Sequence, residues 1–381
     1  MLILFIDMYN IVYVSHESES LLGSSRSLYN MIHSLRKQVT PIVILPNVGP
    51  VYDFFKSRGI KCMVIHYPLD ITEKSGIRYV LTFIPRFIRD YFLYKKTIAY
   101  AKKNIDCQEI DIIHSNSSTV DWGYKLAKSL KKPHVWHLRE FQDLDFDFKP
   151  FLGWKHLINE INNSSVTISI THSICRHFKQ EGKDNAYQLY NAVRSLRDIR
   201  LDAEKDSYFL LCGNLSKAKG LELAISSFAI FSEKQSTHKL KLVGHIDDFY
   251  RQKLMLLINR LNLDCLVEFE PFTENIDILF RKASGYLMCS KNEAMGRVTV
   301  EALFNGCPVI GYDGGGTPEI IKDGINGFLF KTPEQCALAM QRVLNPEISS
   351  CIIKNGFDTV RQYFTEESYR GRLLSIYSTL K

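Results

Sequence analysis

Short apolar runs recur along this chain, and segments long enough for a helix separate them. Runs rich in Val, Ile and Leu that alternate with helices are typical of parallel sheets covered on both faces. The runs form two series, which predict strands at 2–6, 42–45, 62–65, 111–115, 134–138 and 166–170, and then at 208–212, 239–243, 267–270, 286–289 and 308–311. The spacing therefore predicts an α/β protein with two Rossmann-like domains.

A polar, charged stretch separates the two series. It covers residues 191–206, and we interpret it as a linker between a first domain at 1–190 and a second domain at 207–359. Ligands of such sheets bind outside the carboxyl ends of the strands. We therefore expect the two parallel sheets to face each other across a cleft that contains the functional site.

Composition excludes several classes of protein. The 381 residues are 45% hydrophobic and 23% charged, with a net charge of +7, so the chain is neither disordered nor a nucleic-acid binder with a dense basic face. No apolar run approaches the length that spans a bilayer. Nine cysteines without a Cys-x-x-Cys pair, and no signal peptide, predict reduced thiols in the cytoplasm.

The segment at 290–321 is the most informative one. Glu293 lies in a loop after a predicted strand, Gly296 follows it, and Glu301 lies on the early turns of a predicted helix. The amides that begin this helix, at 296–299, form an anion site, and Gly296 lets the backbone approach a ligand closely. Two carboxylates beside a phosphate site indicate a phosphorylated ligand rich in hydroxyls. Acidic capping of a strand–loop–helix unit is an equally good explanation of the spacing alone.

Two further glycine-containing turns follow strands. In GNLSKAKG, at 213–220, Lys219 precedes a helix start and could neutralise a diphosphate, although a loop lysine is usually only solvated. In GGGTPEI, at 314–320, Thr317 suits an N-cap and Pro318 the first helical position, which is a structural explanation.

In the first half of the chain, polar residues gather where predicted strands end. His137, Arg139 and Glu140 lie at or just beyond the end of one strand, Asn116 follows another, and a Gly-Ser-Ser turn begins at Gly23. Such residues would face the cleft. A lone histidine is more often structural, so a catalytic role for His137 needs independent support.

The triplet of aspartates at 143, 145 and 147 is the one candidate for a metal site. Asp-x-Asp can hold a divalent ion beside a diphosphate, but no His or Cys accompanies the triplet in the sequence. We interpret it as a solvated loop and expect no bound metal.

Residues 77–103 carry seven basic residues against one acid, Asp90, with aromatic residues at helical spacing. A basic, aromatic helix suits the surface of an anionic membrane. The alternative is an aromatic stripe packed in the core beneath a solvated basic face. Pro85 is expected to break or to begin a helix here.

Taken in order, these segments resemble the group 1 retaining glycosyltransferases (family 4), which have the GT-B fold. The resemblance covers most of the chain through the Gly-Ser-Ser turn, the HLRE strand end, YNAV at 190–193, the GN…KG turn, EAMGRVTVE at 293–301, GGGTPEI and DGINGFL at 323–329. It implies that a helix at about 360–381 packs back on the first domain. It also implies a donor-binding set of Gly23, Asn214, Lys219, Glu293, Ala294, Met295, Gly296, Arg297, Val298, Thr299 and Glu301.

Within that set, the resemblance implies that Glu301 binds the ribose, Glu293 the donor sugar, and Lys219 the diphosphate. It makes His137 and Glu293 the catalytic residues, and leaves Asn116, Arg139 and Glu140 as acceptor-side candidates. The family commonly has Arg where this chain has Asn214, so one diphosphate cation is missing. Arg297 or Arg139 is expected to compensate, or the donor is held less tightly.

The function implied is retaining, metal-independent transfer of a sugar from a nucleoside-diphosphate sugar, with a UDP-sugar favoured. The acceptor would be a saccharide or lipid-linked saccharide in bacterial polysaccharide or envelope synthesis, at the inner face of a membrane if residues 77–103 bind it. Two alternatives are a non-catalytic homologue that binds sugar nucleotides, and an epimerase or phosphorylase on a similar fold.

Overall fold

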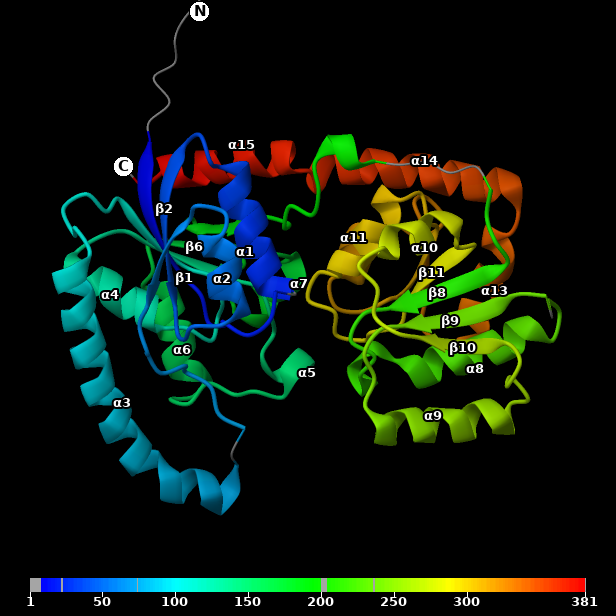
Figure 1. Ribbon diagram of the computed structural model, residues 1–381, viewed down its shortest axis with the longest axis horizontal. Helices are drawn as coiled ribbons and strands as arrows, with labels where there is room; N and C mark the ends of the chain where they lie inside the picture. The colour runs from blue at the N-terminus through cyan, green and yellow to red at the C-terminus, as the bar shows by residue number, and fades with distance from the viewer. Residues whose placement is uncertain (1–7, 22, 74, 200–203, 236, 381) are drawn as a thin grey trace, which may run out of the picture. The chain divides into compact units, whose positions relative to one another are not determined.

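The computed structural model describes the chain except for residues 1–7, 22, 74, 200–203, 236 and 381. Contacts divide it into two compact units (Figure 1). Unit 1 comprises Met1–Ala192 and Tyr369–Lys381, and unit 2 comprises Val193–Ser368. No helix in the described part of the chain is long and apolar enough to cross a membrane.

Unit 1 is built on a seven-stranded parallel sheet in the order β3-β2-β1-β4-β5-β6-β7. Its strands are β1 (Tyr9–Val14), β2 (Val39–Leu45), β3 (Lys61–Val64), β4 (Ile112–Ser115), β5 (His134–Leu138), β6 (Val166–Ser169) and β7 (Ala186–Gln188). Its helices are α1 (Gly23–Ser34), α2 (Pro50–Lys56), α3 (Gly76–Asn104), α4 (Trp122–Leu130), α5 (Asp143–Phe146), α6 (Trp154–Asn162) and α7 (His172–His177).

Unit 2 is built on a six-stranded parallel sheet in the order β10-β9-β8-β11-β12-β13. Its strands are β8 (Tyr208–Cys212), β9 (Lys239–Val243), β10 (Val267–Glu270), β11 (Gly285–Met288), β12 (Val309–Tyr312) and β13 (Phe328–Phe330). Its helices are α8 (Leu221–Ser232), α9 (Asp248–Arg260), α10 (Ile276–Lys282), α11 (Arg297–Phe304), α12 (Thr317–Ile320), α13 (Pro333–Val343) and α14 (Pro346–Tyr363), with 3-10 turns at Leu196–Asp198 and Lys217–Lys219.

The prediction of two parallel α/β sheets is confirmed. The expected strand at 2–6 lies outside the described residues, and the first strand of the structure, β1, was missed because Asn10 and two tyrosines interrupt its apolar pattern. The short strands β7 and β13 were missed as well, because three residues carry too little pattern.

The last helix, α15 (Glu366–Ser378), packs its apolar side against unit 1. Tyr369, Leu373 and Tyr377 are fully buried in the same core as residues of β1, β2 and α1. Part of the expected linker lies outside the described residues. Residues 191–192 of this stretch belong to unit 1. From Val193 on it belongs to unit 2, where both terminal nitrogens of Arg194 donate to the Asp277 carboxylate at 2.7 and 2.5 Å.

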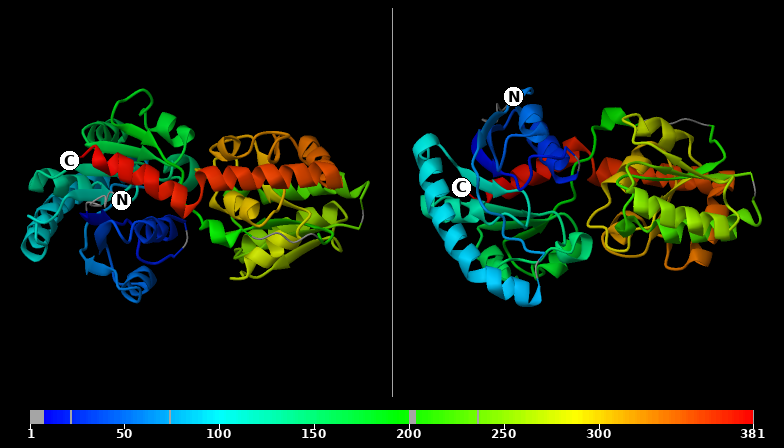
Figure 2. Two further views of the ribbon diagram at one scale, coloured as in Figure 1. Left: turned by 90° about the horizontal axis from the view of Figure 1, so that it is seen from above. Right: turned by 60° about the horizontal axis from the view of Figure 1, so that its bottom comes forward.

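Helix α3 continues through Pro85, so the expected break at this proline is wrong. Proline removes one backbone donor and disturbs one turn, and a helix of 29 residues tolerates that loss with a bend. Figures 1 and 2 show α3 as a long curved helix at the outer side of unit 1. Only Asp90, Thr97 and Ala101 of this helix are buried.

Candidate donor site and the polar edge of unit 1

The strand order of unit 2 places a switch point between β8 and β11. The strands β9 and β10 extend the sheet on one side of β8, whereas β11, β12 and β13 extend it on the other. Chain connections therefore leave β8 and β11 in opposite directions, which opens a crevice at the carboxyl ends of these two strands. The loops at 213–220 and 289–296, which hold most of the expected donor residues, follow these two strands.

Lys219 and Glu293 join these two loops through an ion pair. The Lys219 Nζ lies 2.8 Å from the Glu293 Oε2, and the two side chains are 29% and 18% exposed. Burial raises the pKa of Glu293, but the Lys219 charge and hydrogen bonds from Lys219, Ser290 and the Gly296 amide together hold it below the usual value. The structure thus brings together two residues expected at the donor, and each fixes the position of the other.

A glycine turn after β12 holds the backbone of Glu293. The Gly316 amide donates to the Glu293 carbonyl at 2.7 Å. Gly315 has φ +57, and a Cβ there would lie 2.8 Å from the Glu293 nitrogen and closer still to its carbonyl oxygen. The turn therefore shapes the site, although the sequence indicated only a structural role. Gly316, and not Thr317, is the N-cap of α12, so that expectation is wrong by one residue.

The loop after β11 ends at Gly296, which has φ +83 and is the N-cap of α11. Gly296 has no side chain that could cap this helix, and the start of a helix carries a positive potential that favours anions. Ala294, Arg297 and Val298 are half-buried, whereas Met295 and Thr299 are buried. The Thr299 Oγ1 has no hydrogen-bond partner among the described residues. The start of α11 thus presents backbone donors and a hydroxyl, as an anion site requires.

Glu301 lies one turn into α11 and pairs with Arg297. The Arg297 Nε donates to the Glu301 Oε1 at 3.0 Å, and both side chains are largely buried. Arg297 also donates to the Val193 carbonyl at 3.3 Å. Arg297 thus orients the carboxylate expected to bind ribose. Asn214 is exposed after β8, and Arg297 is engaged with Glu301, so the expectation that Arg297 replaces the missing cation finds no support in this geometry.

In unit 1, Arg139 organises the carboxyl edge of the sheet around β4 and β5. Its Nε donates to the Asn116 Oδ1 at 2.7 Å, and its Nη1 donates to the Asn191 side chain. Asn116 in turn donates to the carbonyl of Ser24 at 3.4 Å, next to Gly23 at the start of α1. Arg139 and Asn116 are buried. The structure therefore places Asn116 and Arg139 together, beside Ser24 at the start of α1.

His137 is the last residue but one of β5, and its side chain is fully buried. Its Nδ1 lies 3.2 Å from the His114 Nε2 and 3.3 Å from the Arg139 Nη2. Burial, with help from the charges of Arg139 and His114, holds the pKa of His137 well below its usual value. The Nε2 has no partner among the described residues. Its expected role at the donor sugar stays a prediction.

Glu140 is buried against the loop after β4. Its Oε1 accepts from the hydroxyl of Ser117 at 2.5 Å and from the amide and hydroxyl of Ser118 at 2.7 and 2.6 Å. Glu140 therefore fixes this loop to the end of β5. A serine-rich loop beside a strand-end glutamate could have suggested this arrangement from the sequence.

Asp143 and Asp145 of the aspartate triplet lie in the short helix α5 and not in a solvated loop, and Asp147 follows the end of this helix. Asp145 is half-buried and accepts from the Phe141 amide at 2.9 Å, and burial raises its pKa to about 7. His177, which the sequence did not connect with the triplet, lies 3.1 Å from Asp143. Among the described residues, no three His, Cys, Asp or Glu side chains are arranged to hold a metal ion.

A second charged cluster lies beneath α3 and α4. Lys125 pairs with Asp121 and lies 3.8 Å from Glu160, and Tyr94 donates to Asp121. Burial, together with the Asp121 charge, raises the pKa of Asp70 to about 8, and burial raises that of Glu160 to about 7. Burial thus keeps Asp70 and Glu160 partly protonated near neutral pH.

Comparison with known proteins agrees with the fold. Residues 193–357 match the family model "Glycosyl transferases group 1". An uncharacterised glycosyltransferase of Methanocaldococcus jannaschii is 24% identical over 325 residues, which cover 84% of this chain and 86% of the relative.

Two solved structures share the fold over almost the whole chain. The Anabaena protein HepE in complex with UDP has a TM-score of 0.77 at 21% identity and covers 97% of this chain and 100% of its own. A Staphylococcus aureus TarM mutant in complex with Fondaparinux, α-GlcNAc-glycerol and UDP has a TM-score of 0.76 at 13% identity, with 97% and 100% covered. Residues 193–357 carry the match to the group 1 glycosyltransferase model, and the chain as a whole shares the GT-B fold of these solved structures.

Proposed function

We propose that this protein transfers a sugar from a nucleoside-diphosphate sugar to a hydroxyl of a saccharide or lipid-linked saccharide, with retention of the anomeric configuration. A UDP-sugar is the favoured donor. The observation that carries the proposal is the Lys219–Glu293 pair at the switch point of unit 2, beside the uncapped start of α11. HepE bound to UDP-glucose, with a TM-score of 0.74, supports the same donor class.

Each residue of the donor site has a chemical role in this proposal. The amides at the start of α11 and the Lys219 ammonium would bind the diphosphate, whose negative charge grows as its bond to the anomeric carbon breaks. Glu301, held by Arg297 at 3.0 Å, would accept hydrogen bonds from the ribose hydroxyls. Glu293, kept ionised by Lys219, would accept one from the donor sugar.

The reaction needs no further group from the protein to balance. The bond between the anomeric carbon and the diphosphate oxygen breaks, and the acceptor oxygen bonds to that carbon. The proton of the acceptor hydroxyl passes to an oxygen of the leaving diphosphate on the same face, which is consistent with retention. Lys219 and the helix start supply positive potential at the diphosphate, so we propose that the reaction is metal-independent.

The proposal also covers the acceptor and the cellular location of the enzyme. We place the enzyme in the cytoplasm, in bacterial polysaccharide or envelope synthesis, with residues 77–103 in contact with an anionic membrane. The exposed apolar and basic side chains of α3 support this contact. Helix α3 contributes only three buried residues, which argues against the alternative of a core-packed stripe.

The test is a transfer assay with a panel of nucleoside-diphosphate sugars and simple glycoside or glycerol acceptors. NMR of the product would give the anomeric configuration of the new bond, and a parallel reaction would contain EDTA. We expect release of one nucleoside diphosphate per new α-bond from an α-linked donor, at the same rate in chelator. An inverted product would refute retention, and loss of rate in EDTA restored by Mn²⁺ would refute metal independence.

The same assay separates the rival functions. A sugar isomerised without an acceptor would indicate an epimerase, and cleavage that requires inorganic phosphate would indicate a phosphorylase. Nucleotide binding without turnover on any acceptor in the panel would favour a non-catalytic homologue.

A further inference from the structure

One line of residues along α3 is apolar in its first half and basic in its second half. Steps of three and four residues bring positions onto one face of a helix, and such steps here connect Ile77, Leu81, Ile84, Ile88, Tyr91, Lys95, Ile98 and Lys102. In the first half the side chains are highly exposed: Ile77 is 78%, Leu81 72% and Ile84 66% exposed. We call Ile77, Val80, Leu81, Ile84, Ile88 and Phe92 the α3 stripe.

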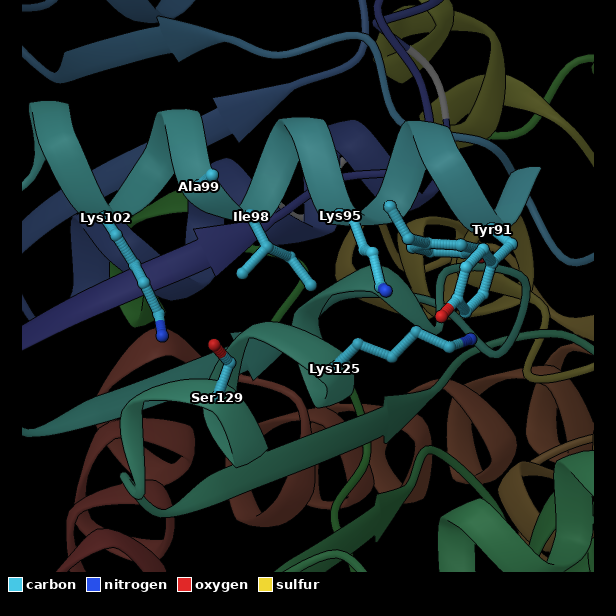
Figure 3. A pocket seen from close by; sticks show the side chains of 8 residues that line it. Tyr91, Lys95, Ile98, Ala99, Lys102, Lys125 and Ser129 are labelled. Atoms are coloured by element: carbon cyan, nitrogen blue, oxygen red, sulfur yellow. The ribbon is translucent and has the colours of Figure 1, made fainter. Parts of the chain in front are cut away.

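The residues in the second half of this row, from Tyr91 to Lys102, form one wall of a groove between α3 and α4. The groove has a volume of about 460 Å³, and it is lined by Tyr91, Tyr94, Lys95, Ile98, Ala99, Lys102, Lys125 and Ser129. Figure 3 shows Lys95 and Lys102 extending from α3 toward α4, where the Lys125 side chain and the Ser129 hydroxyl face them. We call this the α3–α4 groove.

The lysines of the groove differ in whether a carboxylate neutralises their charge. Lys125 pairs with Asp121 and lies near Glu160, and these charges outweigh burial and raise its pKa. Lys95 lies 4.4 Å from the ring of Tyr91, and neither Lys95 nor Lys102 pairs with a carboxylate among the described residues. Two uncompensated ammonium groups and a hydroxyl in an apolar groove suit a phosphate whose substituents are apolar.

We propose that the α3–α4 groove binds the phosphate of an anionic phospholipid while the α3 stripe inserts into the same leaflet. The inference deepens the membrane contact of the proposed function and rests on it. A single headgroup held in the groove would fix which side of α3 enters the bilayer. The stripe leads directly into the groove, so the acyl chains and the phosphate of one lipid meet their matching surfaces.

Charge argues for a bilayer over a protein partner. Residues 77–103 carry seven basic residues and one acid, and that acid, Asp90, is buried and pairs with Arg86 and Arg89. The exposed surface of α3 is thus apolar and cationic, which matches an anionic leaflet and repels a second copy of itself. Arg86 also donates to the Leu69 carbonyl at 2.9 Å, so this arginine serves the fold and is a poor probe of the membrane.

The test compares two pairs of lysines on the same helix. Lys95→Gln with Lys102→Gln removes the groove charges, whereas Lys96→Gln with Lys103→Gln removes two exposed charges one position further round the helix. Both pairs lose the same charge. Binding would be measured by co-sedimentation with phosphatidylcholine vesicles containing about 30 mol% phosphatidylglycerol, at about 0.15 and 0.5 M salt, because high salt screens exposed charges. Leu81→Ser with Ile84→Ser tests the stripe, and thermal melting checks that each variant is folded.

We expect the control pair to bind within about twofold of the parent in high salt, where bulk attraction is screened. The groove pair is expected to bind at least about tenfold more weakly at both salt concentrations, as the loss of a phosphate contact implies. The stripe variant should also lose binding, and free inorganic phosphate at millimolar concentration should not release the parent.

Equal vesicle binding by the two double lysine variants would refute phosphate binding in the groove, since only non-specific electrostatic attraction would remain to explain the binding. Release by inorganic phosphate would assign the groove to a free anion, and a parent that fails to bind vesicles or dimerises through α3 would overturn the inference entirely. Nucleoside-diphosphate binding would be measured on the same samples. Failure of vesicle binding with intact nucleotide binding refutes this inference and the proposed membrane contact, but not the proposed sugar transfer. Vesicle binding without nucleotide binding refutes the proposed sugar transfer alone.

Discussion

Replacing Lys219 by Met tests the ion pair that connects the two loops of the donor site. The pair is 2.8 Å long and its side chains are 29% and 18% exposed, so it lies between the surface and the buried extremes. Its loss leaves the Glu293 carboxylate half-buried without its cation. We expect a cost of about 1–3 kcal/mol at neutral pH, or a melting temperature of unit 2 lowered by roughly 2–10 °C.

The difference in stability between the parent and Lys219→Met should depend on pH. With Lys219 present, the folded-state pKa of Glu293 is below its usual value, so the pair stabilises above the unfolded pKa of 4.5 and loses that contribution as the pH falls. In Lys219→Met burial dominates and the pKa of Glu293 rises, so the ionised carboxylate destabilises at pH 7. The gap between parent and variant should therefore be largest at pH 7 and shrink toward pH 4.

Differential scanning calorimetry at several pH values would measure the gap. Lys217→Met is the matched control, because Lys217 is exposed in the same 3-10 turn and forms no ion pair among the described residues. Glu293→Gln combined with Lys219→Met should recover part of the lost stability, since no uncompensated charge remains. Equal melting temperatures for the two lysine variants at pH 7, or a gap that does not change with pH, would refute the reasoning.

Three further perturbations test other parts of the structure. Gly315→Ala should abolish most transfer while leaving the chain folded, because the new Cβ would displace the Glu293 backbone; normal turnover would contradict this. Because the folded-state pKa of Asp70 is raised, the parent should lose up to about 1.4 kcal/mol of stability per pH unit as the pH rises from roughly 4 to 8. Asp70→Asn should remove this loss, and parallel curves of melting temperature against pH for parent and variant would refute the prediction. His137→Ala should cost about 2–4 kcal/mol in thermal unfolding, because it leaves a cavity beside buried Arg139; an unchanged melting temperature would show that the histidine is not structural.

Alternating apolar runs and helix-length gaps predicted both parallel sheets, because buried parallel strands need continuous Val, Ile and Leu. The pattern failed where it was interrupted, as in β1, or too short, as in β13. At Pro85 the sequence predicted a helix boundary that the structure does not have, because the long helix α3 continues through this proline.

The local positions of the candidate donor residues could be predicted, but their pairings were not. Glu293 and Glu301 were found from their spacing around Gly296, which the helix start of α11 explains. The Lys219–Glu293 pair and the backbone contact of Gly315 are tertiary and leave no local pattern, whereas Arg297 and Glu301 form an i,i+4 pair within α11 that the sequence could have indicated. His137 was expected to face the cleft because HLRE turns polar at the strand end. The strand β5 ends at Leu138 as expected, but the His137 side chain is fully buried.

Isothermal titration of UDP, GDP and ADP into the parent, Lys219→Met and Glu301→Ala tests the central claim, that the loops of unit 2 bind a nucleoside diphosphate. We expect the parent to bind one of the three, UDP by preference. Each substitution should weaken that binding about tenfold or more, as the loss of a charge-assisted hydrogen bond implies. A parent that binds none of the three, or variants that bind as tightly as the parent, would contradict the account.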